Sequence, residues 1–343
     1  MKVEDVRKCS FEKWYNAFTK VTIKSIILPL PDGFTSYILK DGIFLPKSSK
    51  EQCIAKRNSS DSEEEEVWED SEEADVSEVP HFADFDKSIQ DAIKTLGGKV
   101  FPKLNWSSPQ DASWISFNNS CCCESVSDVY LLLKSSDFIV HDLTQRFLKC
   151  EDFVTDEESN KLMPDQEVEK FYLILRKWRE IDTSGEFRCF IVNNTLIGIS
   201  QREPSAYFEH IGRYKSDIVE DIVSFYQTHI HLKFPATNYV FDVYRRIKGR
   251  VCLIDFNPFG SVTDSLLFSW DELNSDSIKV DENRLPEFRF VDDNHGVQPR
   301  SLSYHAVPRD IVDISTGEDS FKLVDLLKMK IDEQKSSEDD ENI

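Results

Sequence analysis

The sequence lacks the glycine-rich motifs that mark the commonest nucleotide-binding folds. Its 11 glycines among 343 residues form neither a GxGxxG fingerprint nor a P-loop. A protein kinase would need a glycine-rich loop before its strand lysine and a His-Arg-Asp catalytic loop, and neither occurs. Asp255-Phe256-Asn257 resembles the kinase Asp-Phe-Gly motif only superficially, so these absences argue against the kinase and P-loop classes.

Basic residues and long apolar runs are also scarce. The chain has 41 Lys and Arg against 63 Asp and Glu, a net charge of -22, which makes nucleic acid and anionic lipid poor partners and a basic protein surface a better one. No stretch approaches the roughly 20 apolar residues of a membrane helix, and the first residues lack a signal peptide's apolar run. The eight cysteines form no CxxC pair and no zinc-binding spacing with His. We therefore expect a soluble cytoplasmic protein with reduced thiols, and no direct contact with nucleic acid or membrane.

The acidic residues are unevenly distributed along the chain. Eleven lie between Asp61 and Glu78, where no Lys or Arg occurs. Such a run cannot bury enough apolar surface to offset its chain entropy, so we expect a disordered loop there. We divide the chain into the N-terminal part of the globular fold (1–60), the acidic loop (61–80), the core (81–280), a C-terminal segment (281–333) and a charged, mobile tail (334–343).

The periodicity of apolar residues predicts an α+β fold. Helical spacing predicts helices at 11–18, 82–96, 125–134 and 214–229. Strands are expected at 25–31, 99–106, 171–178, 186–192, 195–201, 239–245 and 250–256. Asn193-Asn194 lies between the strands 186–192 and 195–201, and Lys248-Gly249 lies between the strands 239–245 and 250–256. Asn193-Asn194 is a good two-residue hairpin turn because Asn tolerates positive φ.

The hairpin around Lys248-Gly249 carries two acids that we expect to face each other. This turn pairs Asp242 with Asp255 and Val240 with Asn257. Opposed residues have Cβ atoms roughly 5 Å apart, so the two carboxylates repel each other unless one is protonated or a cation compensates them. Two Asp and an amide on one face suit magnesium. The alternative is a pair of solvent-facing acids, and a slip of one residue would separate them.

The hairpin around Asn193-Asn194 collects polar side chains at one end. Its expected register puts Glu186 opposite Gln201, so that Glu186, Arg188 and Gln201 share one face of an otherwise apolar strand pair. Phe187 and its alternate neighbours then point the other way. The polar face is typical of a wall that binds a ligand.

Lys103 lies on an apolar strand, where an uncompensated ammonium group would be costly. A phosphate would be a natural counter-charge; the alternative is a lysine at a sheet edge that extends its ammonium group to water. An ATP-grasp arrangement needs no glycine signature, because it holds a nucleotide between two sheets with lysines, a hinge strand and late acidic magnesium ligands. An ATP-grasp fold that holds the nucleotide between two mainly antiparallel sheets is thus compatible with the sequence.

Several runs of the sequence resemble the cell division cycle protein 123 family. The resemblance covers nearly the whole chain and is broken mainly by the acidic loop. It rests on Trp14-Tyr15, on Thr22 to Pro31, on Val100-Phe101-Pro102-Lys103-Leu104-Asn105-Trp106, on Leu175-Arg176-Lys177-Trp178, on Glu186 to Phe190, on Ile199-Ser200-Gln201-Arg202, on Leu253 to Gly260 and on Asp313 to Asp319.

The resemblance implies an atypical ATP-grasp fold in a protein that binds ATP and magnesium and acts as an assembly chaperone. Its partner would be the gamma subunit of eukaryotic translation initiation factor two, whose joining to the alpha subunit it would promote. The resemblance implies magnesium ligands at Asp242, Asp255 and Asn257, a phosphate contact at Lys103, an adenine-side hinge at Arg176, Lys177 and Trp178, a ribose and phosphate wall at Glu186, Arg188, Gln201 and Arg202, and a further cofactor contact at Trp106.

Two other functions would use the same magnesium-nucleotide site. One is an ATP-grasp ligase that joins a carboxylate to an amine through an acyl phosphate, and the other is a protein in which the nucleotide is purely structural. Fold alone does not separate them. We can name no acceptor pocket from the sequence, so a nucleotide-binding chaperone is favoured over a catalyst.

Two segments outside the site carry further hypotheses. Ser60 and Ser62 each have an acid three residues on, the pattern of acidophilic kinase sites, and the alternative is an unmodified spacer. Residues 301–330 include a helix pattern with an apolar stripe that contains Leu327. We expect this segment to contribute to the gamma-subunit docking surface; the alternative is that the stripe packs on its own domain.

Overall fold

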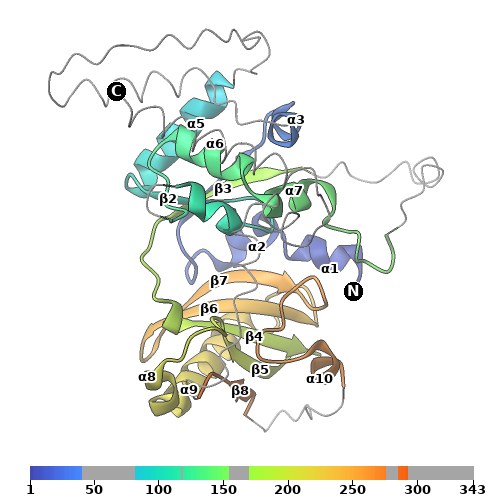
Figure 1. Ribbon diagram of the computed structural model, residues 1–343. Coiled ribbons are helices and arrows are strands. Elements are labelled where there is room, and N and C mark those ends of the chain that lie inside the picture. Colours follow the sequence, from blue (N-terminus) through green and yellow to red (C-terminus); the bar gives the residue numbers. More distant parts are fainter. Residues whose placement is uncertain (41–81, 117–118, 154–169, 276–284, 293–343) are drawn as a thin grey trace, which may run out of the picture. The chain divides into compact units, whose positions relative to one another are not determined.

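The computed structural model describes residues 1–40, 82–116, 119–153, 170–275 and 285–292, all within one compact unit, Met1–Gln298. This unit contains two β-sheets with helices packed on them (Figure 1). The expected α+β class with two mainly antiparallel sheets is confirmed. The acidic loop with Ser60 and Ser62, the stretch 301–330 and the tail 334–343 lie outside the described residues.

The smaller sheet has three antiparallel strands in the order β1 (Ser25–Pro29), β3 (Tyr172–Lys177) and β2 (Val100–Lys103). It shares one apolar core with helices α3 (Phe34–Leu39), α5 (Ala83–Leu96), α6 (Val126–Lys134) and α7 (Asp137–Thr144). Helix α5 ends at Gly97, whose φ of 103° is the left-handed conformation that glycine adopts without strain. Ser125 caps α6 by accepting a hydrogen bond from the Asp128 N–H.

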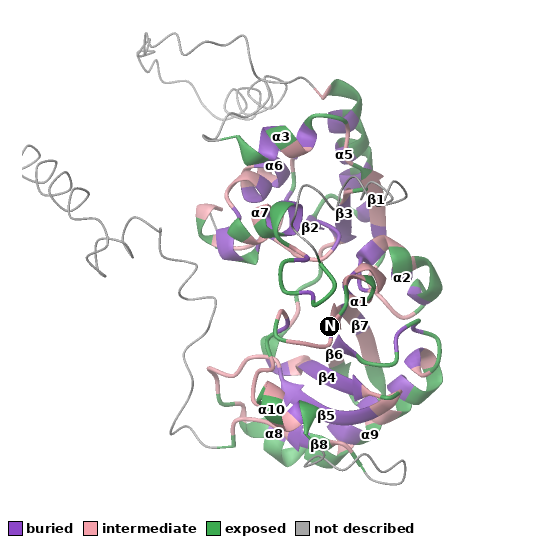
Figure 2. Cartoon of the chain, turned by 90° about the vertical axis from the view of Figure 1, so that its right-hand side faces the viewer, coloured by how far each residue is buried: buried purple, intermediate pink, exposed green. Residues whose placement is uncertain are grey.

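The larger sheet has five strands in the order β7 (Arg250–Pro258), β6 (Tyr239–Ile247), β4 (Glu186–Val192), β5 (Thr195–Gln201) and β8 (Glu287–Arg289). Only the pairing of β5 with β8 is parallel among these strands. Strand β8 falls in the segment 281–333, so this part of the segment belongs to the sheet. Strands β4 and β5 are largely buried (Figure 2).

The two faces of the larger sheet differ. One face packs in a single core with α2 (Phe11–Phe18), α8 (Glu209–Arg213), α9 (Lys215–Phe225) and the π-helical turn η5 (Tyr226–Ile230). On the other face, Phe190 and Val240 pack at one end with Leu273 of α10 (Trp270–Asn274), while polar side chains occupy the rest. The remaining short elements are α1 (Val3–Lys8), η2 (Gln110–Ile115) and η4 (Thr183–Gly185).

The register predicted for the β6–β7 hairpin is confirmed where it matters for the site. Asp242 pairs with Asp255 and Val240 pairs with Asn257. Between this pair and the turn, two irregularities shift the register by one residue and then restore it, after Asp242 and after Arg245. The predicted pairing is therefore correct because two β-bulges cancel.

The register predicted for the β4–β5 hairpin is wrong at its far end. The turn is as expected, with φ of 49° at Asn193 and 58° at Asn194. A β-bulge at Phe190/Ile191 then shifts the pairing, so that Phe187 rather than Glu186 faces Gln201. Gln201 therefore lies on the opposite face of the sheet from Glu186 and Arg188.

The described residues contain no helix that is both long and apolar enough to cross a membrane. Seven of the cysteines lie in this part of the chain, and all seven are free thiols. The helix expected at 214–229 is α9 followed by the π-helical turn η5. Helices α1, α3, α7, α8 and α10 were not predicted, and each is short, so that few positions repeat along one face.

Candidate functional site

A cavity of about 540 Å³ lies between the two sheets, a volume typical of sites for small molecules. Strands β2 and β3 line it from the smaller sheet, and β4, β6 and β7 line it from the larger one. Its wall contains six cationic side chains and four carboxylates: Lys103, Arg176, Lys177, Arg179, Arg188 and Arg202, against Glu180, Glu186, Asp242 and Asp255. Apolar surface comes from Ile23, Phe101, Trp106, Phe138, Trp178, Ile181 and Ile254. The cavity therefore suits an anionic ligand that has an apolar part.

Asp242 is held by donors of its own sheet. The Arg188 guanidinium donates to both carboxylate oxygens, Nε to Oδ1 at 2.8 Å and Nη2 to Oδ2 at 2.7 Å. Asn257 Nδ2 donates to Oδ2 at 3.3 Å, and Arg202 Nε lies 3.8 Å from the same oxygen. Burial alone would raise the pKa of Asp242, but the charges of Arg188 and Arg202 and the hydrogen bonds from Arg188 and Asn257 together outweigh it and hold the pKa below its ordinary value. Asp242 is thus ionised and accepts hydrogen bonds at both carboxylate oxygens.

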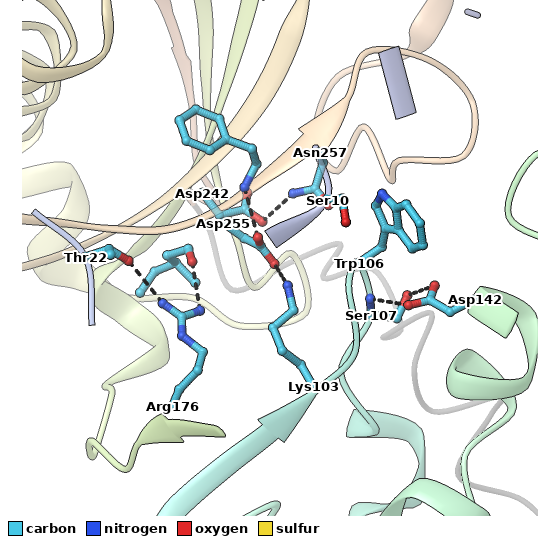
Figure 3. A network of polar contacts seen from close by, with 12 residues as sticks. Ser10, Thr22, Lys103, Trp106, Ser107, Asp142, Arg176, Asp242, Asp255 and Asn257 are labelled. Carbon is cyan, nitrogen blue, oxygen red and sulfur yellow. Dashed lines mark hydrogen bonds and ion pairs between the residues drawn. The ribbon is translucent and has the colours of Figure 1, made fainter. Parts of the chain in front are cut away.

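Asp255, on the facing strand, is held by a donor of the other sheet. Lys103 Nζ lies 2.5 Å from Asp255 Oδ2 (Figure 3). The Lys103 side chain is 2% exposed, so its charge would be costly without this carboxylate. The ammonium also lies 5.1 Å from the centroid of the buried Phe11 ring, within the range of a cation–π interaction. The pair joins β2 to β7 across the cavity.

Arg176 forms a second connection between the sheets. Its guanidinium donates from Nη1 to the Ile254 carbonyl at 2.8 Å and from Nη2 to the Thr22 hydroxyl at 3.2 Å. It also lies 5.3 Å from the centroid of the Phe11 ring. Burial lowers the pKa of Arg176, and its Nε is buried without a hydrogen-bond partner among the described residues. A cationic group in this condition favours an anionic or acceptor ligand close by.

Glu186 introduces a titratable group into the same wall. Burial raises its pKa to about 7, against the opposing effect of the Arg202 guanidinium. The neighbouring Arg188 charge, followed by burial, lowers the pKa of Arg202. At neutral pH Glu186 is therefore partly protonated, and the positive charge of Arg202 is incompletely compensated.

The segment after β2 is held in place by a buried acid. Asp142 on α7 accepts hydrogen bonds from the Ser107 N–H at 2.6 Å and the Ser107 hydroxyl at 2.7 Å (Figure 3). Burial raises the pKa of Asp142, while the hydrogen bonds from Ser107 oppose the rise. Trp106 Nε1 donates to the Val6 carbonyl at 2.8 Å. These contacts fix Trp106 and Ser107, which both line the cavity.

Eleven of the twelve candidate cofactor residues predicted from the sequence line this one cavity: Lys103, Trp106, Arg176, Lys177, Trp178, Glu186, Arg188, Arg202, Asp242, Asp255 and Asn257. Gln201 does not line it. Its amide instead donates to the Glu203 and Ala206 carbonyls and accepts a hydrogen bond from the Val291 N–H. The physical reason is the β-bulge in β4–β5, which turns Gln201 away from the polar face.

Several residues of the cavity wall were missed by the sequence reasoning. Phe101 alternates with Lys103 on β2, and this period of two was a usable signal. No sequence signal marks Gln110 or Phe138 as cavity residues, because η2 and α7 carry no pattern that indicates the cavity. The support from Asp142 depends on a contact between residues 35 positions apart.

A metal ion was expected to compensate the facing carboxylates of Asp242 and Asp255, but side chains compensate them in the structure. The cations that compensate them are Arg188 and Lys103, from the chain itself. No group of three or more His, Cys, Asp or Glu that could hold a metal occurs in the described part of the chain. The residues would therefore fit magnesium only together with ligand oxygens, an arrangement that magnesium commonly adopts with one or two carboxylates and phosphate.

Comparisons with known proteins agree with the resemblance seen in the sequence. Proteins named translation initiation factor eIF2 assembly protein are 44% identical in Xenopus tropicalis (99% of this chain, 100% of that protein) and 34% identical in Dictyostelium discoideum (94% and 95%). The solved structure of Cdc123 from Schizosaccharomyces pombe has 33% identity and a TM-score of 0.64 over 84% of this chain and 97% of that one. The D123 family model matches residues 14–315. The chain therefore belongs to the D123 family.

Proposed function

We propose that this chain assists the assembly of eIF2 and that its cavity binds ATP with magnesium in an atypical ATP-grasp site. The names of its full-length relatives support the assembly role. The observation that carries the ligand assignment is the cavity wall, where six cations exceed four carboxylates and apolar side chains supply much of the remaining surface. A nucleoside triphosphate would match both the cationic and the apolar parts of the wall, because it has a largely apolar base and a polyanionic triphosphate.

The cavity residues divide between the two ends of such a ligand. Phe101, Ile254 and the hinge residues from Arg176 to Trp178 would accommodate the base, while Lys103, Arg188 and Arg202 would attract the phosphates. Asp255 and Asn257 would hold magnesium together with phosphate oxygens, and Asp242 would support them by fixing Arg188. The metal would supply neutralisation of phosphate charge.

Calorimetry of the purified full chain tests the ligand assignment. ATP with magnesium should bind much more tightly than adenosine, because cations outnumber carboxylates among the charged side chains of the site. Asp255→Ala should remove the magnesium-dependent part of the affinity, and Lys103→Ala should weaken the phosphate contact. Asp271→Ala, an exposed acid on α10 outside the cavity, is the matched control and should bind as the parent does. Equal affinity for adenosine and ATP would contradict the assignment.

The proposed partner is the gamma subunit of eIF2. A net charge of -22 would steer a basic surface toward the chain and speed their encounter. Leu327 lies outside the described residues, and on this proposal Leu327→Asp abolishes co-purification of the gamma subunit while ATP binding persists. Raised salt should slow association more than it speeds dissociation. A folded Leu327→Asp protein with unchanged partner affinity would rule out this docking segment.

A further inference from the structure

The two residues best suited to bind magnesium and phosphate are bound to each other. Asp255 Oδ2 and Lys103 Nζ are 2.5 Å apart, and both side chains line the cavity. The ammonium is 2% exposed and the carboxylate 18% exposed, so the pair faces a partly enclosed site. A ligand that used either group would have to separate them.

We propose that the Lys103–Asp255 pair is a latch that exchanges partners when magnesium and a nucleotide bind together. Asp255 transfers from the ammonium to the metal ion, and Lys103 transfers from the carboxylate to a phosphate. This inference rests on the proposed nucleotide site and adds to it a coupling between the two ligands. The exchange conserves charge compensation, because each buried group leaves one opposite charge and gains another.

The facing acid does not share this behaviour. Asp242 receives two hydrogen bonds from Arg188 and one from Asn257, all within the larger sheet. A guanidinium bound to both oxygens is harder to displace than a single ammonium, because two bonds break at once. The geometry therefore assigns the exchangeable role to Asp255 alone.

Two contacts keep the rest of the site in place during the exchange. The Phe11 ring lies under both Lys103 and Arg176, at 5.1 and 5.3 Å, so its attraction for the ammonium remains after the carboxylate has left. Arg176 remains on the Ile254 carbonyl, which is adjacent to Asp255 on β7. The exchange is thus a local change of side-chain partners.

The latch makes the two ligands cooperative. Magnesium alone would leave Lys103 buried and unpaired, and a metal-free nucleotide would leave Asp255 unpaired beside phosphate charge. Each half of the exchange is therefore unfavourable, and both halves together are compensated. In terms of linkage, magnesium raises nucleotide affinity by the same factor by which the nucleotide raises magnesium affinity.

The first test needs no nucleotide. Manganese(II), as a paramagnetic probe for the magnesium position, is titrated into the wild-type chain and into Lys103→Met, and bound metal is measured by electron paramagnetic resonance. Loss of the lysine frees Asp255, so Lys103→Met should bind manganese at least about tenfold more tightly than the wild type. The matched control is Lys99→Met, which removes an exposed lysine outside the cavity. Equal manganese affinity in all three proteins overturns the latch.

The second test uses ATP in the presence of a chelator. Asp255→Asn releases Lys103, so metal-free ATP should bind roughly tenfold more tightly than to the wild type, and added magnesium should give no further gain. General loss of one negative charge would produce a similar gain, and the double variant separates the two causes. In a Lys103→Met background the latch predicts that Asp255→Asn has no effect on metal-free ATP. A gain that persists in that background overturns the latch.

The outcomes distinguish the latch from the nucleotide site on which it rests. If the wild type binds no ATP with magnesium while Lys103→Met gains manganese, the nucleotide assignment fails, and the competition between a metal ion and Lys103 for Asp255 stands. If ATP binds but manganese affinity is unchanged in Lys103→Met, the latch fails alone. Should Lys103→Met unfold, Lys103→Gln keeps a polar group and replaces it in both titrations.

Discussion

Asp242 and Asp255 face each other on one hairpin, yet their surroundings differ. Asp242 is bound by Arg188 from the neighbouring strand and by Asn257 from the facing strand, all within one sheet. Asp255 is bound by Lys103, which reaches it from the other sheet. The two aspartates therefore differ in role. Asp242 completes an ion-pair network within one sheet, and Asp255 forms the contact between the sheets that we propose a ligand replaces.

The largest effect is expected when the cation of the Arg188–Asp242 pair is removed. Arg188→Met leaves Asp242 buried without its main donor, and breaking a buried ion pair typically costs about 3–5 kcal/mol. Urea denaturation should therefore give a free energy of unfolding lower by about this amount. Adding Asp242→Leu to the variant should recover much of the loss, because the uncompensated charge is gone. A loss below about 1 kcal/mol would mean that Asp242 is no more fixed than Asp255.

The next largest effect concerns Glu186, which lies in the same wall but has no such partner. Burial raises its pKa to about 7 from an ordinary value of 4.5. Below pH 4.5 the carboxyl is protonated in both states; between 4.5 and 7 the folded chain holds the proton more tightly than the unfolded chain does. The contribution of Glu186 to the free energy of unfolding therefore falls as the pH rises through this window, by on the order of 1–3 kcal/mol.

The measurement is the difference between the wild type and Glu186→Gln at each pH. Glutamine stays neutral, so the variant should gain stability relative to the wild type from pH 5 to pH 8. Above pH 8 the difference should be constant, because the carboxylate is ionised in both states. A flat difference across the whole range would contradict the raised pKa.

The sequence predicted the elements of the site better than their registers. Strands β4 and β5 have the predicted bounds, but one bulge turned Gln201 away from the cavity. Beside the bulge, Gly198 lies opposite Phe190, and a Cβ at Gly198 would lie 2.9 Å from the Phe268 ring. The contact between Gly198 and Phe268 is long-range, and no local sequence pattern predicts it. In β6–β7 two bulges cancelled, so the pairing of Asp242 with Asp255 was correct without either bulge having been foreseen.

The pairing of Arg188 with Asp242 and of Lys103 with Asp255 could not be predicted from the sequence, for a different reason. The proximity of two carboxylates was correctly derived, and the need for a compensating cation followed from it. Which cation compensates each acid depends on strand order: β4 lies beside β6, and β2 reaches β7 from the other sheet. Lys103 and Asp255 are 152 residues apart, and periodicity within a strand carries no information at that distance.

A smaller effect is expected at Phe11, which serves the exchangeable side of the comparison. Pentafluorophenylalanine at position 11 keeps nearly the volume of the ring but reverses its quadrupole, so the attraction of Lys103 and Arg176 is lost. The expected loss is about 1–2 kcal/mol of unfolding free energy. The same substitution at Phe187, which is equally buried and has no lysine or arginine over its ring in the described residues, should cost less. Equal losses at the two positions would remove the electrostatic role of Phe11.

The smallest effect is expected at the other end of the same hairpin. Lys248 Nζ lies 2.9 Å from Asp217 Oδ1, a distance close to that of the Lys103–Asp255 pair, but the Lys248 side chain is 69% exposed. In water its charge is already solvated, and ordering two mobile side chains offsets most of the attraction. Lys248→Gln should therefore leave the urea midpoint of unfolding unchanged, with little dependence on salt. Because Lys248 and Asp255 lie on one hairpin, a comparable loss in Lys248→Gln and Lys103→Gln would show that burial is not what separates the pairs.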